Sequence, residues 1–317
     1  MIWVWIAVIA AALFVIFLLL PAFTIFFAVF SRKKTKPFEQ YNLKKYKNHY
    51  YMDYIGRIAE KRKFVKSHPV EEVFTTSYDG LRLAADYYDL GMSKTAIIFH
   101  GFNAEVYTNL SAHGAFLMKS GFNVLFVTHR SHGKSEGRWS TIGLREQNDV
   151  LSWVKWAENR GAAQILLYGV SMGGFTVAGA SDRLEGTKVR SMVIDSGFYS
   201  VYEQMKRDSK KNHIPAIMLP AQALLTRLFL RVDIRRPSVL SLKNTKTPAF
   251  FLHGTDDETV EYKWAQTNYK ACASEKELLI VEGAPHTLSI LKDPETVEKR
   301  LTGFLDKYFS AKERNQL

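Results

Sequence analysis

The chain opens with a long run of apolar residues. Residues 1–30 contain no charged side chain, and a helix needs about 20 apolar residues to cross the hydrocarbon core of a bilayer. Trp3 and Trp5 suit one membrane interface, and the basic residues that follow Ser31 suit the other. A signal peptide would have a basic start and a shorter apolar core, and a buried core helix is a further alternative. We therefore expect a transmembrane anchor over residues 1–30.

From residue 70 onward, short apolar runs alternate with longer segments of helical pattern. Strands are expected at 70–77, 81–90, 95–100, 123–127, 164–170, 189–194, 248–252 and 277–281, and helices at 106–119, 143–159, 172–182, 260–273 and 293–309. Tyr78-Asp79-Gly80 joins the first two strands with a hairpin turn signal. This alternation predicts an α/β fold, with a mostly parallel sheet covered by helices on both faces.

The alternation stops between residues 195 and 247, where bulky apolar residues are mixed with arginines. We expect this insertion to form a small helical cap over the site. The predicted organisation is a transmembrane anchor (1–30), a basic juxtamembrane segment (31–69) and a catalytic domain (70–311) that contains the cap (195–247). The pattern of 31–69 fits either a helix along the membrane or against the domain, or a solvated linker.

Composition and charge narrow the range of partners. A chain of 317 residues can bury a core without disulfides, and the single cysteine, Cys272, has no internal partner. The net charge is +12, and residues 31–72 contribute twelve basic and five acidic side chains. No nucleic-acid recognition motif accompanies this charge, so anionic lipid is the favoured partner. The positive-inside rule then predicts that most of the chain lies in the cytoplasm.

A G-x-S-x-G motif centred on Ser171 follows a short apolar run and precedes a stretch of small residues. This order of strand, sharp turn and helix exposes a serine hydroxyl above a sheet. Gly169 and Gly173 are expected where strand and helix pass too close for a Cβ atom. The helix N-terminus that follows favours developing negative charge. Ser171 is therefore a candidate nucleophile.

A nucleophilic serine needs a base within hydrogen-bond reach and a third group that orients the base. Ligands of a parallel sheet gather at the carboxyl ends of its strands. The predicted strand 248–252 is followed by a loop with Asp256 and Asp257, and the last predicted strand is followed by His286. The chain order is serine, aspartate, histidine, which is the order of this architecture.

On these motifs, residues 70–309 resemble the α/β-hydrolases. They are most similar to membrane-anchored serine-hydrolase-like proteins of Gram-positive bacteria, often labelled cell-surface hydrolases, and also to the Bem46-like hydrolases. The resemblance implies that the acid is Asp257, the last aspartate of an H-G-x-x-D-x-x-V run ending at Val260, with Asp256 as the alternative. It implies His286 as the base. The label also leaves the cell surface open as an alternative location.

The resemblance further implies an oxyanion hole. Its donors would be the backbone N–H groups of Phe102, in the loop His100-Gly101-Phe102, and of Met172, the residue after the nucleophile. The other histidines beside these motifs are expected to shape loops (His100 and His253) or to hydrogen-bond within them (His129 and His132).

The predicted function is hydrolysis of carboxylic acyl esters, of the carboxylesterase or lipase-like type (EC 3.1.1), on a small or lipid-like substrate. The same groups would cleave acyl thioesters, including acylated proteins. A serine peptidase or amidase and a non-catalytic membrane adaptor with the same fold are the alternatives. The chemistry needs no cofactor, and the scattered His and Cys form no metal-ligand pattern. The sequence predicts neither the acyl group nor the oligomeric state.

Overall fold

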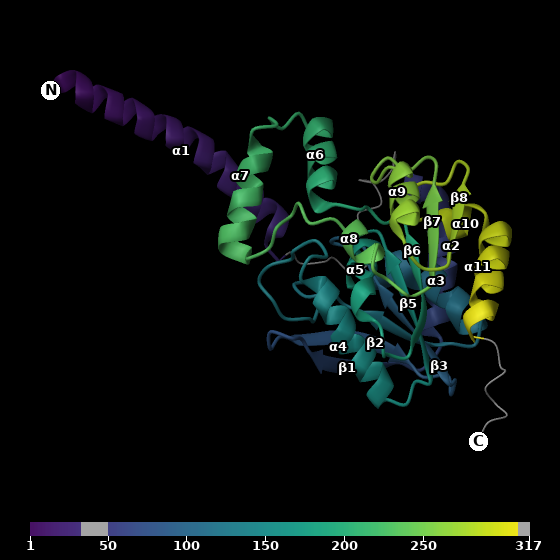
Figure 1. Ribbon diagram of the computed structural model, residues 1–317. Helices are drawn as coiled ribbons and strands as arrows, with labels where there is room; N and C mark the ends of the chain where they lie inside the picture. Colours follow the sequence, from purple (N-terminus) through teal and green to yellow (C-terminus); the bar gives the residue numbers. More distant parts are fainter. Residues whose placement is uncertain (33–49, 310–317) are drawn as a thin grey trace.

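The computed structural model describes residues 1–32 and 50–309, without the side chains of 11–19, 50 and 51. An eight-stranded sheet runs through the centre of the molecule (Figure 1) in the order β1-β2-β4-β3-β5-β6-β7-β8. Its strands are β1 (Glu71–Thr76), β2 (Arg82–Tyr88), β3 (Lys94–Phe99), β4 (Asn123–Val127), β5 (Gln164–Val170), β6 (Val189–Asp195), β7 (Ala249–Gly254) and β8 (Lys276–Val281). β2 is antiparallel to β1 and β4, and the remaining pairs are parallel. The predicted hairpin and mostly parallel sheet are confirmed.

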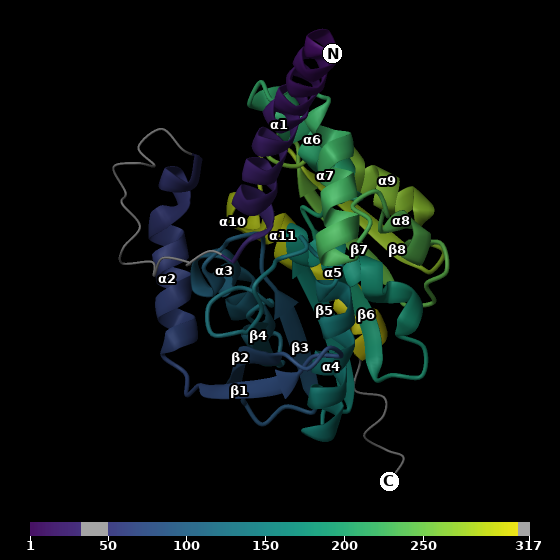
Figure 2. The same ribbon diagram turned by 90° about the vertical axis from the view of Figure 1, so that its left-hand side faces the viewer.

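Helices cover both faces of this sheet (Figures 1 and 2). One face carries α2 (Ile55–Lys66), α3 (Val106–Lys119), α10 (Ser289–Lys292) and α11 (Pro294–Phe309). The other carries α4 (Glu146–Asn159), α5 (Met172–Ala180), α8 (Val239–Leu242) and α9 (Lys263–Ala271). Short 3₁₀ turns, η3 (Tyr50–Tyr54) and η4 (Ser181–Arg183), precede α2 and follow α5.

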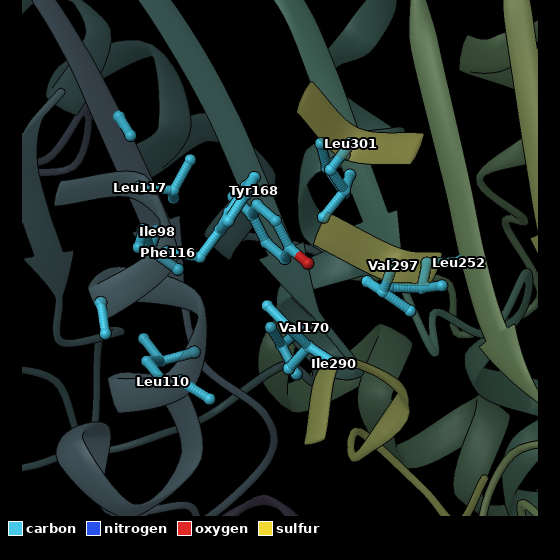
Figure 3. Packing of buried hydrophobic residues seen from close by; sticks show 14 of the residues in the cluster. Ile98, Leu110, Phe116, Leu117, Tyr168, Val170, Leu252, Ile290, Val297 and Leu301 are labelled. Carbon is cyan, nitrogen blue, oxygen red and sulfur yellow. The ribbon is translucent and has the colours of Figure 1, made fainter. Parts of the chain in front are cut away.

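Two hydrophobic cores lie on the two faces because side chains alternate along each strand. In β5, Leu166, Tyr168 and Val170 belong to one core, and Ile165 and Leu167 belong to the other. Figure 3 shows Tyr168 with side chains of α3 on one side and side chains of α11 on the other. β5 is therefore buried on both faces, which holds the turn at its carboxyl end in a fixed place.

Two predicted helices begin later than expected because an acidic side chain holds the backbone before each of them. Glu146 accepts hydrogen bonds from the backbone N–H groups of Thr141 and Gly143, so α4 begins at Glu146 and not at residue 143. Asp257 accepts hydrogen bonds from the N–H groups ahead of α9, which begins at Lys263 and not at residue 260.

The insertion after β6 is helical. It contains α6 (Val201–Lys211), α7 (Met218–Leu225), the π-helical turn η5 (Thr226–Leu230) and α8. Of the basic segment 31–69, residues 55–66 form α2, which packs against α3. Residues 33–49 lie outside the described part of the chain. The division into domains stays a prediction.

The first helix, α1 (Ile2–Phe30), projects from the rest of the molecule at its N-terminal end (Figure 1). At its other end, Ala22, Phe26 and Phe30 are fully buried in a third core together with α7 and the residues around Met172. The predicted membrane span is not borne out: across the residues described here, no helix combines the length and the apolar character needed to cross a membrane.

Candidate active site

The turn after β5 holds Ser171 in an unusual backbone conformation. Its φ is 55° and its ψ is −113°, a sparsely populated combination that costs on the order of 1–3 kcal/mol for a non-glycine residue. A Cβ atom on Gly169 would lie 2.2 Å from the carbonyl oxygen of Gly173, and one on Gly173 would lie 2.1 Å from that of Phe99. The close approach predicted at both glycines is therefore confirmed. The Ser171 N–H also donates to the Asp195 carbonyl oxygen at 2.8 Å, which ties the turn to β6.

Three side chains from three separate strand ends meet at this turn. The Nε2 atom of His286 lies 3.0 Å from the Oγ atom of Ser171, and its Nδ1 atom lies 2.6 Å from Oδ2 of Asp257. Because Nδ1 faces a carboxylate, it carries the proton, and Nε2 is left to accept the serine hydroxyl. All three residues are more than nine-tenths buried. Asp256, the alternative acid, is exposed and pairs with Thr255.

Asp257 accepts four hydrogen bonds. His286 and the Nε2 atom of His253 (2.9 Å) approach Oδ2, while the N–H groups of Thr259 and Val260 approach Oδ1. Burial acts to raise the pKa of Asp257, but the charge of His286 and the hydrogen bonds from both histidines outweigh it, so this pKa lies well below its ordinary value. The carboxylate is therefore ionised at neutral pH. The sequence placed His253 in a loop-shaping role and missed its bond to Asp257.

The loop after β3 packs directly on the serine. A Cβ atom on Gly101 would lie 3.4 Å from the Cβ of Ser171, so the backbone of this loop reaches Ser171. Met172 is the first residue of α5, where backbone N–H groups precede the helical hydrogen bonds. Phe102 lines the same cavity as Ser171. The two predicted oxyanion residues therefore flank the serine.

Three buried histidines, His100, His129 and His132, form hydrogen bonds with the backbone of this loop or with one another. The Nδ1 atom of His100 lies 2.6 Å from the Gly101 carbonyl oxygen, and its Nε2 atom accepts the N–H of His129. His132 accepts the N–H of Asn103 through its own Nε2 atom. Burial and the neighbouring His132 lower the pKa of His100 to about 3. These imidazoles are thus neutral hydrogen-bonding groups, as the sequence predicted for His129 and His132.

Comparisons of the sequence with known proteins found a matching family model and several relatives. A family model described as serine aminopeptidase, S33 matches residues 92–243. The uncharacterized protein YqkD of Bacillus subtilis is 29% identical over 223 residues, which cover 67% of this chain and 71% of YqkD. Protein bem46 of Schizosaccharomyces pombe is 24% identical over 183 residues, which cover 57% of each chain.

Two solved structures of esterases are also similar to this chain. The esterase Pf2001 of Pyrococcus furiosus is 25% identical with a TM-score of 0.64, and the alignment covers 76% of this chain and 94% of the esterase. The esterase EaEST of Exiguobacterium antarcticum, 15% identical with a TM-score of 0.57 over 74% of this chain and 100% of the esterase, shares the fold. The chain thus has the α/β-hydrolase fold, and these relatives support a place in that superfamily.

The loop that carries His286 is fixed by a buried polar network that the sequence did not indicate. Asp195, at the end of β6, accepts hydrogen bonds from His113 and from the Ser196 hydroxyl. The Ser196 oxygen in turn accepts the N–H of Thr287, the residue after His286. Thr287 has a φ of 62°, so its backbone needs such support. These residues thus hold the backbone next to His286.

A cavity of about 220 Å³ opens beside Ser171. Its walls include α1, α6 and the loops after β3, before α4, after β6 and before α9. Most lining side chains are apolar, with Gln204, Asp208 and Ser209 as the polar exceptions on α6. Among the residues that the structure describes, no group of His, Cys, Asp and Glu side chains converges in a way that could hold a metal ion.

Proposed function

We propose that this chain is a serine hydrolase that cleaves carboxylic acyl esters through Ser171, His286 and Asp257. The observation that carries the proposal is the continuous chain of contacts from the Ser171 hydroxyl through the His286 imidazole to the Asp257 carboxylate. This arrangement activates a serine that would otherwise be a poor nucleophile. The esterases among the structural neighbours support the same chemistry.

In the proposed reaction, the Ser171 oxygen attacks the carbonyl carbon of the ester while His286 takes the serine proton. Asp257, which is ionised, stabilises the imidazolium that forms. The N–H groups of Phe102 and Met172 donate to the oxyanion, and each such donor contributes about 3–4 kcal/mol in related enzymes. The imidazolium returns its proton to the departing alcohol. Water then attacks the acyl-enzyme with His286 again as the base, which releases the acid and restores the serine.

The proposed substrate carries a short or medium acyl chain. The cavity beside Ser171 is mainly apolar, and its volume of about 220 Å³ is below the roughly 300–1,000 Å³ of ordinary ligand pockets. Acyl thioesters fit the same machinery, because a thiol leaves at least as readily as an alcohol. A set of esters and thioesters of graded acyl length tests this point. A response that does not depend on length would contradict the role given to the cavity.

A serine peptidase or amidase is the second candidate. The family model that matches residues 92–243 is described as serine aminopeptidase, and a carboxylate, Asp208, lines the cavity. An aminopeptidase needs such a carboxylate to bind the substrate ammonium group. Burial raises the pKa of Asp208, however, and Gln204 already donates to it at 3.0 Å. Because Gln204 already occupies one oxygen of this carboxylate, less of it is open to a substrate ammonium group, so we rank the peptidase second.

We also propose that α1 attaches the enzyme to a membrane, with the catalytic domain on the cytoplasmic side. The support is the set of large apolar side chains exposed near the N-terminus, from Ile2 to Ile9, followed by the basic segment 31–72. Carbonate extraction of membranes and protease protection in sealed vesicles test attachment and side. Recovery of the full chain in the soluble fraction would contradict attachment. Protection of the domain from external protease only in inside-out vesicles would favour the cell surface.

The deciding experiment is labelling of the full-length protein with a fluorophosphonate probe, followed by ester hydrolysis, in wild type and Ser171→Ala. We expect labelling and hydrolysis of wild type alone. Equal labelling of both forms would mean that another serine is the nucleophile. No labelling of either, with the cellular effect of the protein retained in Ser171→Ala, would favour a non-catalytic adaptor. Hydrolysis of leucine p-nitroanilide that is lost in Asp208→Asn would favour the aminopeptidase.

A further inference from the structure

Part of the wall of the cavity is built by the N-terminal helix. Ile25 and Val29 of α1 line the same cavity as Ser171, together with Met205 and Ile214 of the insertion. The two α1 residues are four positions apart, so they lie on one face of the helix. Both are only partly buried by the protein itself. Side chains placed in this way are available to contact a ligand in the cavity.

Firm packing of the adjacent helix face determines where Ile25 and Val29 point. Ala22, Phe26 and Phe30 follow the same spacing of four residues and are at most 1% exposed. The ring of Phe26 lies 5.4 Å from that of Trp139 and 5.9 Å from that of Phe229. With one face of the helix buried, the neighbouring face cannot rotate away from the cavity.

Hydrogen bonds fix the end of α1 along its axis as well. The Phe30 carbonyl accepts the N–H of Ser140, and the Arg32 N–H donates to the carbonyl of Arg138. The Arg32 guanidinium donates to the carbonyl oxygens of Gly133 and Ser135, at 2.6 and 2.9 Å. On the other side, the Gln222 amide donates to the Ala22 carbonyl at 2.7 Å. These hydrogen bonds therefore fix the C-terminal end of α1 beside the cavity.

We propose that Ile25 and Val29 form one wall of the acyl-binding pocket and set the length of acyl chain that the enzyme accepts. The inference rests on the proposed ester hydrolysis and extends it by naming the specificity-determining residues. An acyl chain bound to Ser171 extends into the cavity between α1 and α6. A bulkier residue at 25 or 29 shortens the space open to the chain, and a smaller one lengthens it.

The test is the ratio of kcat/KM for p-nitrophenyl octanoate to that for p-nitrophenyl acetate, measured on the full-length protein in detergent micelles. Val29→Trp should lower this ratio about fourfold for each methylene group that it excludes, since a buried methylene contributes about 0.8 kcal/mol. Ile25→Ala and Val29→Ala should raise the ratio of kcat/KM for p-nitrophenyl laurate to that for p-nitrophenyl acetate, because a smaller side chain lengthens the pocket. Circular dichroism and the thermal unfolding midpoint of each variant check separately that it folds.

The matched control is Ala28→Trp, which adds the same bulk at the exposed neighbouring position of the same helix. It should leave the ratio as in wild type. Equal length profiles for Val29→Trp and Ala28→Trp, with wild type active, would overturn the role of α1 and leave the proposed function intact. A wild type that neither cleaves these esters nor reacts with fluorophosphonate would instead remove the proposed function, and this inference with it.

Discussion

The two sides of the cavity differ in how the chain builds them. On one side, Ser171, Asp257 and His286 follow three strands of a single sheet, each within a few residues of a strand end. On the other side, Ile25 and Val29 come from a helix about 140 residues earlier in the chain than the serine. The proposed reacting groups are thus held by the sheet, while the surface that would contact the acyl chain is assembled from distant segments.

The two sides also differ in polarity. The catalytic side is a network of hydrogen bonds in which the Asp257 carboxylate alone accepts four. On the α1 side the helix is held by aromatic packing of Phe26 and Phe30 together with backbone hydrogen bonds, and the two α1 residues that line the cavity are apolar. Hydrogen bonds fix atoms in direction, as proton transfer requires, and apolar packing fixes a volume, as recognition of an acyl chain requires. We expect mutations on the catalytic side to change rate, and mutations on the α1 side to change selectivity.

The largest expected effect is on the catalytic side. Asp257→Asn keeps the shape of the side chain but removes the charge that stabilises the His286 imidazolium, so kcat should fall by about 10⁴-fold. KM should change little, because Asp257 is not among the residues lining the cavity. Steady-state hydrolysis of p-nitrophenyl butyrate measures both. Asp256→Asn, at the exposed neighbouring position, is the control and should retain near wild-type activity.

Equal losses in the two variants would contradict the choice of Asp257 as the acid. A loss in Asp256→Asn alone would move the acid to that residue.

The catalytic side was predictable from sequence because its signals are local. A G-x-S-x-G motif after an apolar run predicts the turn at Ser171, and the chain order serine, aspartate, histidine fits the strand ends. The choice of Asp257 over Asp256 came from a family motif. The structure supplies the reason for that motif: the loop turns Asp257 inward toward His253 and His286 and leaves Asp256 outside.

The α1 side was not predictable, because no local sequence pattern indicates a contact between residues about 140 positions apart. Residues 1–30 are apolar almost throughout, so no amphipathic pattern distinguishes the face that Phe26 and Phe30 bury from the face at Ile25 and Val29. For the same reason the sequence treated this stretch as an anchor and did not assign it to the site. The support of His286 by Asp195 and Ser196 escaped notice too, since a buried aspartate at a strand end has no motif of its own.

The next largest effect should appear on the α1 side. Phe26 is 1% exposed, and removal of a buried phenylalanine ring costs about 3–5 kcal/mol. Phe26→Ala should therefore loosen the end of α1 from the insertion. Hydrogen–deuterium exchange over residues 22–30 of the detergent-solubilised protein measures this loosening, and the octanoate-to-acetate ratio should fall in parallel.

Phe27→Ala is the control, since Phe27 is 46% exposed and its ring leaves a smaller cavity. Similar exchange in the two variants would show that α1 is not held by its buried face. Increased exchange in Phe26→Ala with an unchanged length profile would separate the docking of α1 from acyl selection.

The smallest expected effect is a loss of stability in acid, through protonation of the buried His100. His100 has a pKa of about 3 in the folded protein because of burial and the neighbouring His132, against about 6.5 in an unfolded chain. Between these values the unfolded state binds the extra proton. The free energy of unfolding should therefore fall as the pH drops below about 6.5, by about 1.4 kcal/mol per pH unit for this one group. Stability due to the neutral ring is fully present at pH 7.

Urea unfolding at pH 7, 6, 5 and 4 measures the slope. In His100→Gln, the slope of the unfolding free energy against pH should fall by close to one proton, which is about 1.4 kcal/mol per pH unit. The variant should also be less stable at pH 7, because it loses the bonds to Gly101 and His129. His213→Asn, at an exposed position with a φ of 55° that asparagine tolerates, should keep the wild-type slope. An unchanged slope in His100→Gln would mean that the acid response arises elsewhere. A reduced slope would assign the acid response to His100, whose ring contacts the loop that carries Gly101 and Phe102.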